Sequence, residues 1–293
     1  MEKNGADPTL NEQVKSFFLI GFPVHHSASP YIYNRLFAKR AINARYDAMA
    51  VKKEDLPQAI RILRKIGCGF NVTSPHKRTV VSYLEEIDRT AGEIGAVNTV
   101  VNRNSKLYGY NTDWIGVMKS LERHGIKSHV DSAVVIGAGG AARAVVYALA
   151  GMASSIAIVS QTGVSAVELA RLAEKWGVKR AEGLKPDAPS LKDYFLKADL
   201  IVNASPVGGL EDVDSVPIPP SFLQDRAAVL DLVYNPLKTR LLREAELRGC
   251  RTIDGLWVLC YQAVKNLKLW LGIEPSVEEL RSYGLEYVKG ESQ

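Results

Sequence analysis

Residues 134–142 read Val134-Val135-Ile136-Gly137-Ala138-Gly139-Gly140-Ala141-Ala142, an apolar segment followed by a glycine-rich turn and small residues. The apolar segment predicts a buried strand, and the small residues after the turn predict a helix. Gly137 permits a tight turn, Gly139 lets the backbone approach a pyrophosphate, and Ala142 lets helix and strand pack closely. The free N–H groups and positive dipole of a helix start favour phosphate. The stretch therefore predicts a dinucleotide-binding turn with contacts from Gly137, Ala138, Gly139, Gly140 and Ala141.

Strands and helices are expected to alternate around this turn. The apolar pattern predicts strands at 132–136, 156–159, 200–203 and 229–232, and helices at 141–149, 166–176 and 241–248. This alternation predicts parallel strands with helices on both faces, a Rossmann-like doubly wound sheet. A glycine loop that only turns the chain is the alternative, and the flanking strand and helix disfavour it.

A second set of elements is expected in the first half and at the C-terminal end. The pattern predicts strands at 17–21, 45–51 and 69–73, helices at 31–40 and 54–66, and a hairpin of 96–102 with 106–109. Arg103-Asn104-Ser105 forms the expected turn of that hairpin. Two helices, 258–271 and 276–283, are expected after the Rossmann-like unit. With 293 residues, and at roughly 150 residues per domain, the chain should form two domains.

Composition favours a globular protein that binds small molecules. The chain is 46% hydrophobic and 24% charged, with a formal net charge of +5. Its Lys and Arg residues are scattered among acidic ones, so we expect no nucleic-acid partner and only a mild attraction for anionic metabolites. The apolar stretch 133–159 is interrupted by glycines, which disfavours a membrane span. Oligomeric state is left open between a monomer and a homodimer.

Cysteine usage and the N-terminal segment favour the cytoplasm. Cys68, Cys250 and Cys260 form no Cys-x-x-Cys pair, so neither a disulfide framework nor a zinc site is expected, and each is interpreted as a buried apolar residue. Residues 1–15 are polar, lack the apolar core of a signal peptide, and are interpreted as an extension of the first strand. The adjacent His25 and His26 are interpreted as loop residues, and no metal is expected.

The residues after the strand at 156–159 bear on the choice of dinucleotide. Ser160-Gln161-Thr162-Gly163 should contact the adenosine ribose. An acidic residue here would bind the ribose hydroxyls of NAD, and arginines would bind the 2′-phosphate of NADP. Neither is present. Without a cationic partner for the extra phosphate, the sequence favours NAD over NADP.

Seven motifs, the glycine turn among them, stand in order between Phe18 and Gly272. They are His26-Ser27-Ala28-Ser29-Pro30, Asn71-Val72-Thr73-Ser74-Pro75-His76-Lys77, Gly95-Ala96-Val97-Asn98-Thr99, Asn111-Thr112-Asp113, Gly137 to Ala142, Val233-Tyr234-Asn235-Pro236, and Asp254-Gly255-Leu256 with Gln262. In this order they resemble the motifs of the shikimate dehydrogenases and the related quinate/shikimate dehydrogenases.

The resemblance implies an α/β fold of two domains. A substrate domain with a mixed sheet would comprise residues 1–113 and 256–293, and a Rossmann-like dinucleotide domain would comprise residues 114–255. The C-terminal helices would return to the first domain. The implied activity is the reversible NAD(P)-dependent reduction of 3-dehydroshikimate to shikimate, a step of aromatic amino acid biosynthesis.

The resemblance also implies residue roles. Lys77 and Asp113 resemble the catalytic pair. Ser27, Ser29 and Tyr234 resemble the ligands of the substrate carboxylate, and Gly255 is implied as a further cofactor contact beside Ser160, Gln161 and Thr162. Hydroxyl-binding groups are implied at Thr73, Asn98 and Gln262.

The chemistry of these side chains suits those roles. A ketone that accepts hydride develops negative charge on its oxygen, so a lysine ammonium beside it can stabilise that charge and donate the proton, while a carboxylate orients the lysine. Because the nicotinamide carries the electrons, no metal is needed. Serine and tyrosine hydroxyls can bind a carboxylate, and Asn, Thr and Gln can bind ring hydroxyls.

Each of these residues also has a structural interpretation. Lys77 could be a solvated surface lysine, and Asp113 could cap the helix that follows it. Ser27 and Ser29 could cap the helix near Pro30. Three further residues could have structural places only: Asn98 in the hairpin, Tyr234 in a turn, and Gln262 on an exposed helix face.

Three departures from the family pattern stand out. Residues 160–165 occupy the place of an Asn-Arg-Thr motif and a further arginine in NADP-dependent members, and both arginines are missing. Ser74 replaces an apolar residue of many members. Trp114 replaces glycine, and its ring either alters the pocket or packs between domains.

Three other functions are compatible with a dinucleotide-binding turn. A quinate dehydrogenase that prefers NAD is the principal alternative, because nothing near Ser27, Ser29 and Tyr234 indicates whether an extra hydroxyl on the substrate is accepted. A folate dehydrogenase would leave the paired serines unexplained. A non-catalytic nicotinamide-binding regulator would leave Lys77 and Asp113 unexplained.

Overall fold

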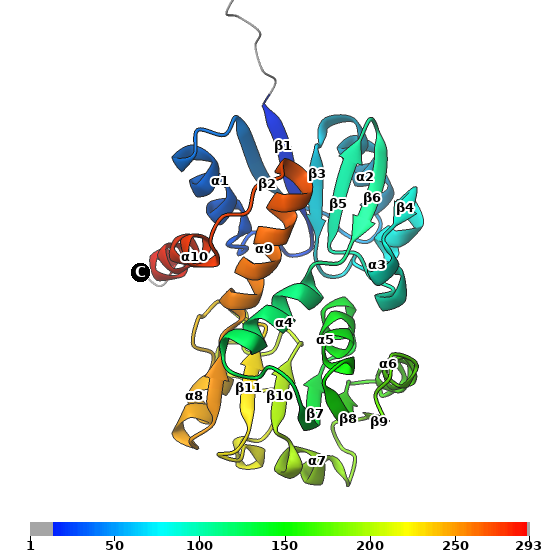
Figure 1. The fold of residues 1–293 in the computed structure, drawn as a ribbon, viewed down its shortest axis with the longest axis vertical. Helices are drawn as coiled ribbons and strands as arrows, with labels where there is room; N and C mark the ends of the chain where they lie inside the picture. The colour runs from blue at the N-terminus through cyan, green and yellow to red at the C-terminus, as the bar shows by residue number, and fades with distance from the viewer. Residues whose placement is uncertain (1–13, 292–293) are drawn as a thin grey trace, which may run out of the picture.

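Two six-stranded sheets, one above the other in Figure 1, form the two lobes of the chain. The computed structural model describes residues 14–291. We call the lobe built on the sheet β2-β1-β3-β5-β6-β4 the first lobe, and the lobe built on β12-β11-β10-β7-β8-β9 the second lobe. The interpretation of residues 1–15 as an extension of the first strand falls almost entirely outside the described residues.

The first lobe has a mixed sheet, as expected. Strands β2, β1 and β3 are parallel, whereas β5 pairs antiparallel with β3 on one side and with β6 on the other. The hairpin turn lies where predicted, with Asn104 and Ser105 in the left-handed region at φ 52° and 65°. The elements are β1 (Lys15–Gly21), α1 (Ser29–Lys39), β2 (Ala44–Ala50), α2 (Leu56–Ile66), β3 (Gly69–Val72), η1 (Thr79–Tyr83), β4 (Glu86–Ile87), α3 (Arg89–Ile94), β5 (Thr99–Arg103) and β6 (Lys106–Tyr110).

The second lobe is the expected doubly wound sheet, and its strand pairs are all parallel. Buried apolar residues form one core on each face of the sheet, around Val135 and around Val134. The strand order reverses between β7 and β10, which is where ligands bind in such sheets. The elements are β7 (Val130–Ile136), α5 (Gly140–Ala150), β8 (Ala153–Val159), α6 (Val164–Lys175), β9 (Arg180–Leu184), α7 (Leu191–Lys197), β10 (Leu200–Asn203), η2 (Pro220–Phe222), β11 (Ala228–Asp231), α8 (Arg240–Leu247) and β12 (Arg251–Ile253).

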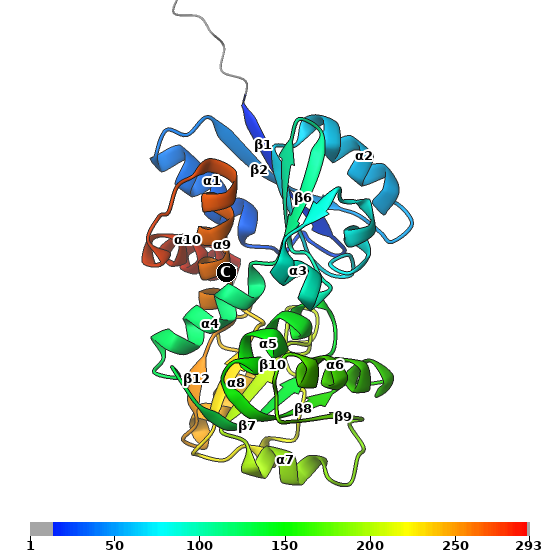
Figure 2. The ribbon, with the colours of Figure 1, turned by 45° about the vertical axis from the view of Figure 1, so that its right-hand side comes forward.

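Helices α4 (Asp113–Arg123) and α9 (Gly255–Leu271) connect the lobes. Figures 1 and 2 show α9 running from the second lobe back to the first, with α10 (Val277–Glu291) beside α1. At the far end of α9, the indole N–H of Trp270 donates to the carbonyl of Val100 at 2.9 Å, and its ring stacks on Phe17. The C-terminal helices therefore return to the first lobe, as expected. We propose that the lobes correspond to two domains, residues 1–113 with 256–293 and residues 114–255.

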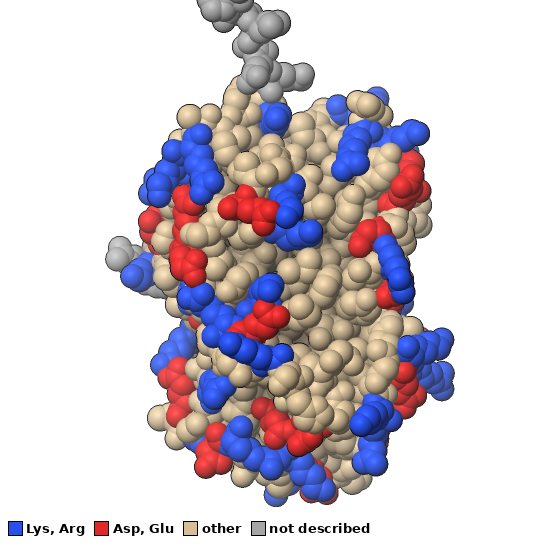
Figure 3. Space-filling view, in the orientation of Figure 1, with Lys and Arg blue, Asp and Glu red and all other residues tan. Residues whose placement is uncertain are grey.

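The surface, the helices and the cysteines each test an expectation from the sequence. On the face shown in Figure 3, Lys and Arg side chains lie among Asp and Glu rather than in a continuous basic stripe. In the described part of the chain, no helix has the length and apolar character needed to cross a membrane. Cys250 and Cys260 are buried, but Cys68 is exposed, so the interpretation of all three cysteines as buried residues was wrong at that position. Cys68 lies in the short connection between α2 and β3, where the residue before it, Gly67, is buried.

Candidate active site

A cavity of about 360 Å³ lies between the lobes, and both contribute to its wall. The carboxyl ends of parallel strands β1 and β3 in the first lobe, and of β7 and β11 in the second, lead into loops that reach it. Every side chain expected to bind substrate or act in catalysis lines the cavity: Ser27, Ser29, Thr73, Lys77, Asn98, Asp113, Tyr234 and Gln262. Ala141 and Gly255 line it too, whereas the other expected cofactor residues lie outside its wall: Gly137, Ala138, Gly139, Gly140, Ser160, Gln161 and Thr162.

Lys77 and Asp113 form an ion pair in this cavity. The Lys77 Nζ lies 2.6 Å from Asp113 Oδ2, and the two side chains are 14% and 16% exposed. The backbone N–H of Val97 donates to the carbonyl of Lys77 at 2.8 Å, which ties the turn after β3 to the start of β5. Lys77 is thus not a solvated surface lysine. Asp113 is the first residue of α4 and not its N-cap, which is Thr112.

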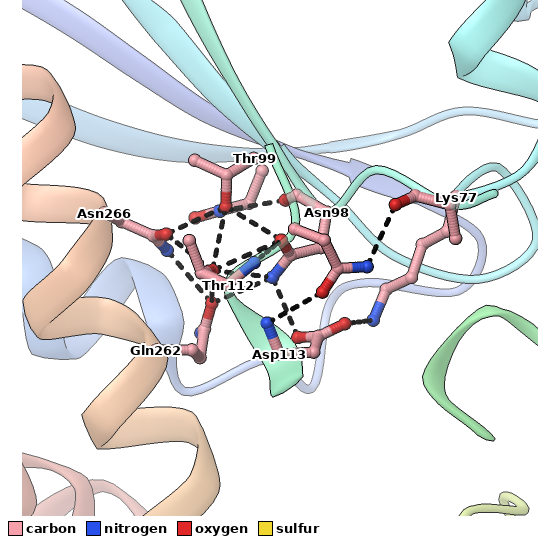
Figure 4. A network of polar contacts seen from close by, with 10 residues as sticks. Lys77, Asn98, Thr99, Thr112, Asp113, Gln262 and Asn266 are labelled. Carbon is pink, nitrogen blue, oxygen red and sulfur yellow. Dashed lines mark hydrogen bonds and ion pairs between the residues drawn. The ribbon is translucent and has the colours of Figure 1, made fainter. Parts of the chain in front are cut away.

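Asn98 holds the second oxygen of the same carboxylate. Its Nδ2 donates to Asp113 Oδ1 at 2.8 Å, while its Oδ1 accepts the backbone N–H of Thr112 at 2.7 Å. Figure 4 shows Asp113 between the amide of Asn98 and the ammonium of Lys77. Both carboxylate oxygens therefore have partners, and the carboxylate has a fixed orientation relative to the lysine.

Behind Asn98 lies a network of buried side chains that joins β3, β5, the start of α4, and α9. Thr99 and Thr112 each donate from Oγ1 to Asn266 Oδ1 at 2.8 Å, and Asn266 Nδ2 donates to Gln262 Oε1 at 3.0 Å. Asn71 Nδ2 donates to Thr99 Oγ1 at 3.0 Å. We call this set, with Asn98 and Asp113, the polar network (Figure 4). Because its members satisfy one another's hydrogen bonds in a buried setting, the network is rigid.

Four members of this network, Asn71, Thr99, Thr112 and Asn266, are not among the site residues predicted from the sequence. Asn71, Thr99 and Thr112 lie in three of the seven motifs, and Thr99 and Thr112 directly adjoin the predicted residues Asn98 and Asp113. Asn266 stands one helical turn after Gln262, on the same face of α9, and is fully buried. The spacing of four residues was the signal that could have identified Asn266.

Ser27 and Tyr234 meet across the lobes. The backbone N–H of Ala28 donates to the Tyr234 hydroxyl at 3.2 Å, and the N–H of Ser29 donates to Ser27 Oγ at 3.3 Å. Burial raises the pKa of Tyr234 above its ordinary value, so its phenol stays protonated at neutral pH. Helix α1 begins at Ser29 with Ala28 as N-cap, so neither serine is the N-cap residue, although Ser27 Oγ accepts the N–H of the first helical residue. The hydroxyls can bind an anion in the cavity.

A second buried network supports the loop that carries Tyr234. Asp231, at the end of β11, accepts from Asn203 Nδ2 at 2.9 Å, from Thr239 Oγ1 at 2.6 Å and from the N–H of Val233 at 3.0 Å. Asp231 is completely buried, and burial raises its pKa to about 6. The bond to Val233 fixes the residue directly before Tyr234.

The glycine turn has the shape that a pyrophosphate needs. Gly137 has φ +111°, and a Cβ there would lie 2.9 Å from the carbonyl oxygen of Ala204, so no other residue fits. A Cβ at Gly139, in contrast, would meet nothing within 4 Å. Gly139 is the N-cap of α5 and makes no side-chain capping bond, which leaves the first N–H groups of the helix for a ligand. These residues fit the phosphates of a dinucleotide.

The turn also touches the catalytic lysine. A Cβ at Gly140 would lie only 2.8 Å from the Cβ of Lys77, so the second lobe contacts the stem of Lys77 directly. A dinucleotide on this turn would therefore approach the ion pair of Lys77 and Asp113. At Gly255, a Cβ would lie 2.4 Å from the carbonyl oxygen of Leu232, which shows how closely the start of α9 packs here.

Neither of the two departures near the pocket places its side chain in the cavity wall. Trp114 does not line the cavity; its ring packs edge-on against Tyr147 of α5 at a centroid distance of 5.9 Å. It is therefore packing between α4 and α5. The carbonyl of Ser74 accepts the backbone N–H of Phe22 at 2.9 Å, and its side chain is likewise absent from the cavity wall.

Comparison with known proteins identifies the family. The family model of the shikimate dehydrogenase substrate binding domain matches residues 19–100. A shikimate dehydrogenase (NADP(+)) of Pyrococcus abyssi is 42% identical and aligns over 93% of this chain and 98% of its own. Shikimate 5-dehydrogenase of Thermus thermophilus, solved with NADP(H) and shikimate, has a TM-score of 0.82, 33% identity, and coverage of 93% and 99%. Quinate dehydrogenase of Corynebacterium glutamicum, solved with NAD, has a TM-score of 0.83, 29% identity, and coverage of 93% and 99%. The chain therefore belongs to the shikimate dehydrogenase family, whose members are NAD(P)-dependent oxidoreductases.

Proposed function

We propose that this protein catalyses the reversible reduction of 3-dehydroshikimate to shikimate, with Lys77 and Asp113 as the catalytic pair. The observation that carries the proposal is the 2.6 Å contact between these two side chains, in a cavity that also holds Ser27, Tyr234 and Gln262. The names of the curated relatives support the same substrate.

The proposed chemistry follows from the charge of the ion pair. The bound nicotinamide supplies hydride to the substrate ketone, or accepts it from the alcohol. As negative charge develops on the ketone oxygen, the Lys77 ammonium stabilises it and donates a proton. Asp113 offsets the charge of the lysine and orients it, and Asn98 holds Asp113 in place through its second oxygen. In the reverse direction, Lys77 and Asp113 together take the proton of the alcohol.

The remaining cavity residues bind the substrate. Ser27, Ser29 and Tyr234 donate hydroxyl hydrogens to the substrate carboxylate, and the protonated phenol of Tyr234 is suited to this. Thr73, Asn98 and Gln262 lie where ring hydroxyls would be recognised. In Asn98 and Gln262 the amide groups are already positioned by the polar network, which lowers the entropic cost of ordering them on binding.

For the dinucleotide, we propose NADP(H) held on the glycine turn. The sequence favoured NAD because residues 160–165 lack arginine, but that preference finds no support in the curated relatives, which are named as NADP(+) enzymes. The alternative function is NAD-dependent oxidation of quinate, which the similarity to the quinate dehydrogenase solved with NAD supports.

A matrix of initial rates tests the proposal. Shikimate and quinate are each oxidised with NAD+ and with NADP+, and the reduced nicotinamide is followed by absorbance. We expect shikimate with NADP+ to give the highest kcat/KM of the four combinations. A higher kcat/KM for quinate with NAD+ would replace the proposal by its alternative, and no activity in any combination would reject both.

A further inference from the structure

We propose that Lys185 is the cation that binds the 2′-phosphate of NADP, in place of the arginines that residues 160–165 lack. This inference rests on the proposed use of NADP(H). It assigns a cofactor-specificity role to a side chain that follows the neighbouring strand β9 rather than to one in the loop after β8.

The sheet brings Lys185 to the adenosine end of the cofactor site. Strands β8 and β9 are parallel neighbours, with Val159 paired to Leu184, so both end at the same edge of the sheet. The N–H of Ser160 donates to the carbonyl of Leu184 at 3.1 Å. In a dinucleotide fold the adenosine ribose is recognised at the end of the second strand of the unit, which is β8 here. Lys185 follows directly after β9, beside that point.

The side chain of Lys185 lies across Gly163. A Cβ at Gly163 would lie 2.7 Å from Lys185 Cγ and 3.3 Å from its Cε. The stem of the lysine therefore occupies the space that a side chain at position 163 would need. Gly163 has φ +72°, in the region that favours glycine, so the loop conformation and the path of the lysine depend on the same residue.

The chemistry around Lys185 suits a phosphate monoester. The loop 160–165 reads Ser-Gln-Thr-Gly-Val-Ser, with hydroxyl groups and no carboxylate. Ser160 Oγ and Ser165 Oγ lie 3.1 Å apart, so two hydroxyls gather at one point of the loop. Lys185 is exposed, and in residues 14–291 it takes part in none of the ion pairs. A lysine is a compact charge with three donors, which suits a dianionic phosphate without the planar geometry of arginine.

The 2′-phosphate is the only group that distinguishes the two dinucleotides, so binding affinity tests the assignment. Kd values of NADP+ and NAD+ are measured by calorimetry for the wild-type protein and for Lys185→Met, which keeps the stem. We expect the Kd of NADP+ to rise about tenfold, as befits one charge contact at a hydrated site, and the Kd of NAD+ to change less than twofold. Lys185→Arg should restore NADP+ affinity. The matched control is Lys179→Met, at an exposed lysine just before β9, where both Kd values should be unchanged.

The outcomes separate the two proposals. If the wild-type protein binds NADP+ and oxidises shikimate with it, but Lys185→Met leaves both Kd values unchanged, the role of Lys185 is wrong and the proposed function stands. Equal losses for NADP+ and NAD+ would also reject it, because a 2′-phosphate contact affects only one of them. If the wild-type protein does not bind NADP+, the proposed use of NADP(H) and the role of Lys185 both fail, and the rates with NAD+ then decide whether the proposed reaction stands. Rising ionic strength should reduce the advantage of NADP+ over NAD+ in the wild-type protein more than in Lys185→Met.

Discussion

The polar network and the glycine turn are two parts of the site that meet at Lys77, and they are held in different ways. The polar network depends on side chains, since Asn98, Thr112 and Asn266 are buried and bonded to one another. The glycine turn depends on backbone shape and on missing side chains, as at Gly137 and Gly139. Lys77 belongs to both, because its ammonium reaches Asp113 while its Cβ faces Gly140.

Because they are held differently, the two regions should respond differently to substitution. Truncation in the polar network leaves a buried partner unpaired, at a cost of about 1–3 kcal/mol for each group. A substitution in the turn acts by volume, and its consequence depends on what the new atom meets. Variants of the two regions should therefore separate loss of turnover from loss of dinucleotide affinity.

The largest effect is expected at Lys77. In Lys77→Met the stem that faces Gly140 is kept but the proton donor is lost, so kcat for 3-dehydroshikimate reduction should fall by roughly a thousandfold or more. The Kd of NADP+, measured by calorimetry, should stay within about twofold. Lys106→Met, at an exposed lysine of the hairpin, is the matched control with unchanged kinetics. Wild-type turnover in Lys77→Met would contradict the catalytic assignment.

Adjacent glycines of the turn should respond differently. At Gly139 an added methyl group meets no protein atom but stands where the pyrophosphate must approach. We therefore expect Gly139→Ala to fold normally and to raise the Kd of NADP+ roughly a hundredfold. In Gly140→Ala the methyl group would press on the Cβ of Lys77, so kcat should fall as well. Calorimetry and steady-state kinetics on both variants check this; identical behaviour of the two would contradict the contact with Lys77.

Asp231 offers a contrast in charge compensation. The carboxylate of Asp113 faces a lysine, whereas the fully buried Asp231 has neutral partners, and burial raises its pKa to about 6. Between about pH 4 and pH 6 the folded protein binds this proton more tightly than the unfolded chain does, so its contribution to the free energy of unfolding falls as pH rises. From pH 4.5 to 7.5 we expect the wild-type protein to lose about 2 kcal/mol relative to Asp231→Asn. Urea unfolding of both proteins across this range measures the difference. If the free energy of unfolding depends on pH in the same way in both proteins, the raised pKa of Asp231 is contradicted.

The smallest effect is expected at the carboxylate site. Ser27→Ala removes one of several donors while Ser29 and Tyr234 remain, so the KM for shikimate should rise about tenfold with a smaller change in kcat. The KM of the dinucleotide should not change. An effect confined to the dinucleotide KM would show that Ser27 contributes to dinucleotide binding and not to substrate binding.

Much of the fold was predictable because periodicity and turn chemistry are local. The strand, turn and helix at 130–150 and the hairpin turn at 103–105 follow from their own residues. Short or polar elements were missed: β4 has two residues, and β12 has three. Strand β9 reads Arg-Ala-Glu-Gly-Leu at the edge of its sheet, where polar residues are tolerated and no apolar pattern forms.

The site was less accessible to local reasoning. Taken singly, Lys77 is typical of a surface lysine and Asp113 of a helix cap. Only the order of the motifs predicts that they form the catalytic pair. Asn266 was missed because the sequence does not say which polar residues of a helix are buried. The preference for NAD rests on the charges of residues 160–163 alone, whereas Lys185, whose side chain lies next to Gly163, follows β9, a strand that the sequence pattern does not predict.

The central claim is that Lys77 and Asp113 act as one unit, and a double-mutant cycle tests it most directly. Single-turnover oxidation of NADPH by 3-dehydroshikimate is measured at saturating concentrations for Lys77→Met, Asp113→Asn and the double variant. Residues that act together give non-additive losses, so we predict that the double variant reacts no more than a few times more slowly than the slower single variant. Losses that multiply, or a wild-type rate in Asp113→Asn, would contradict the claim.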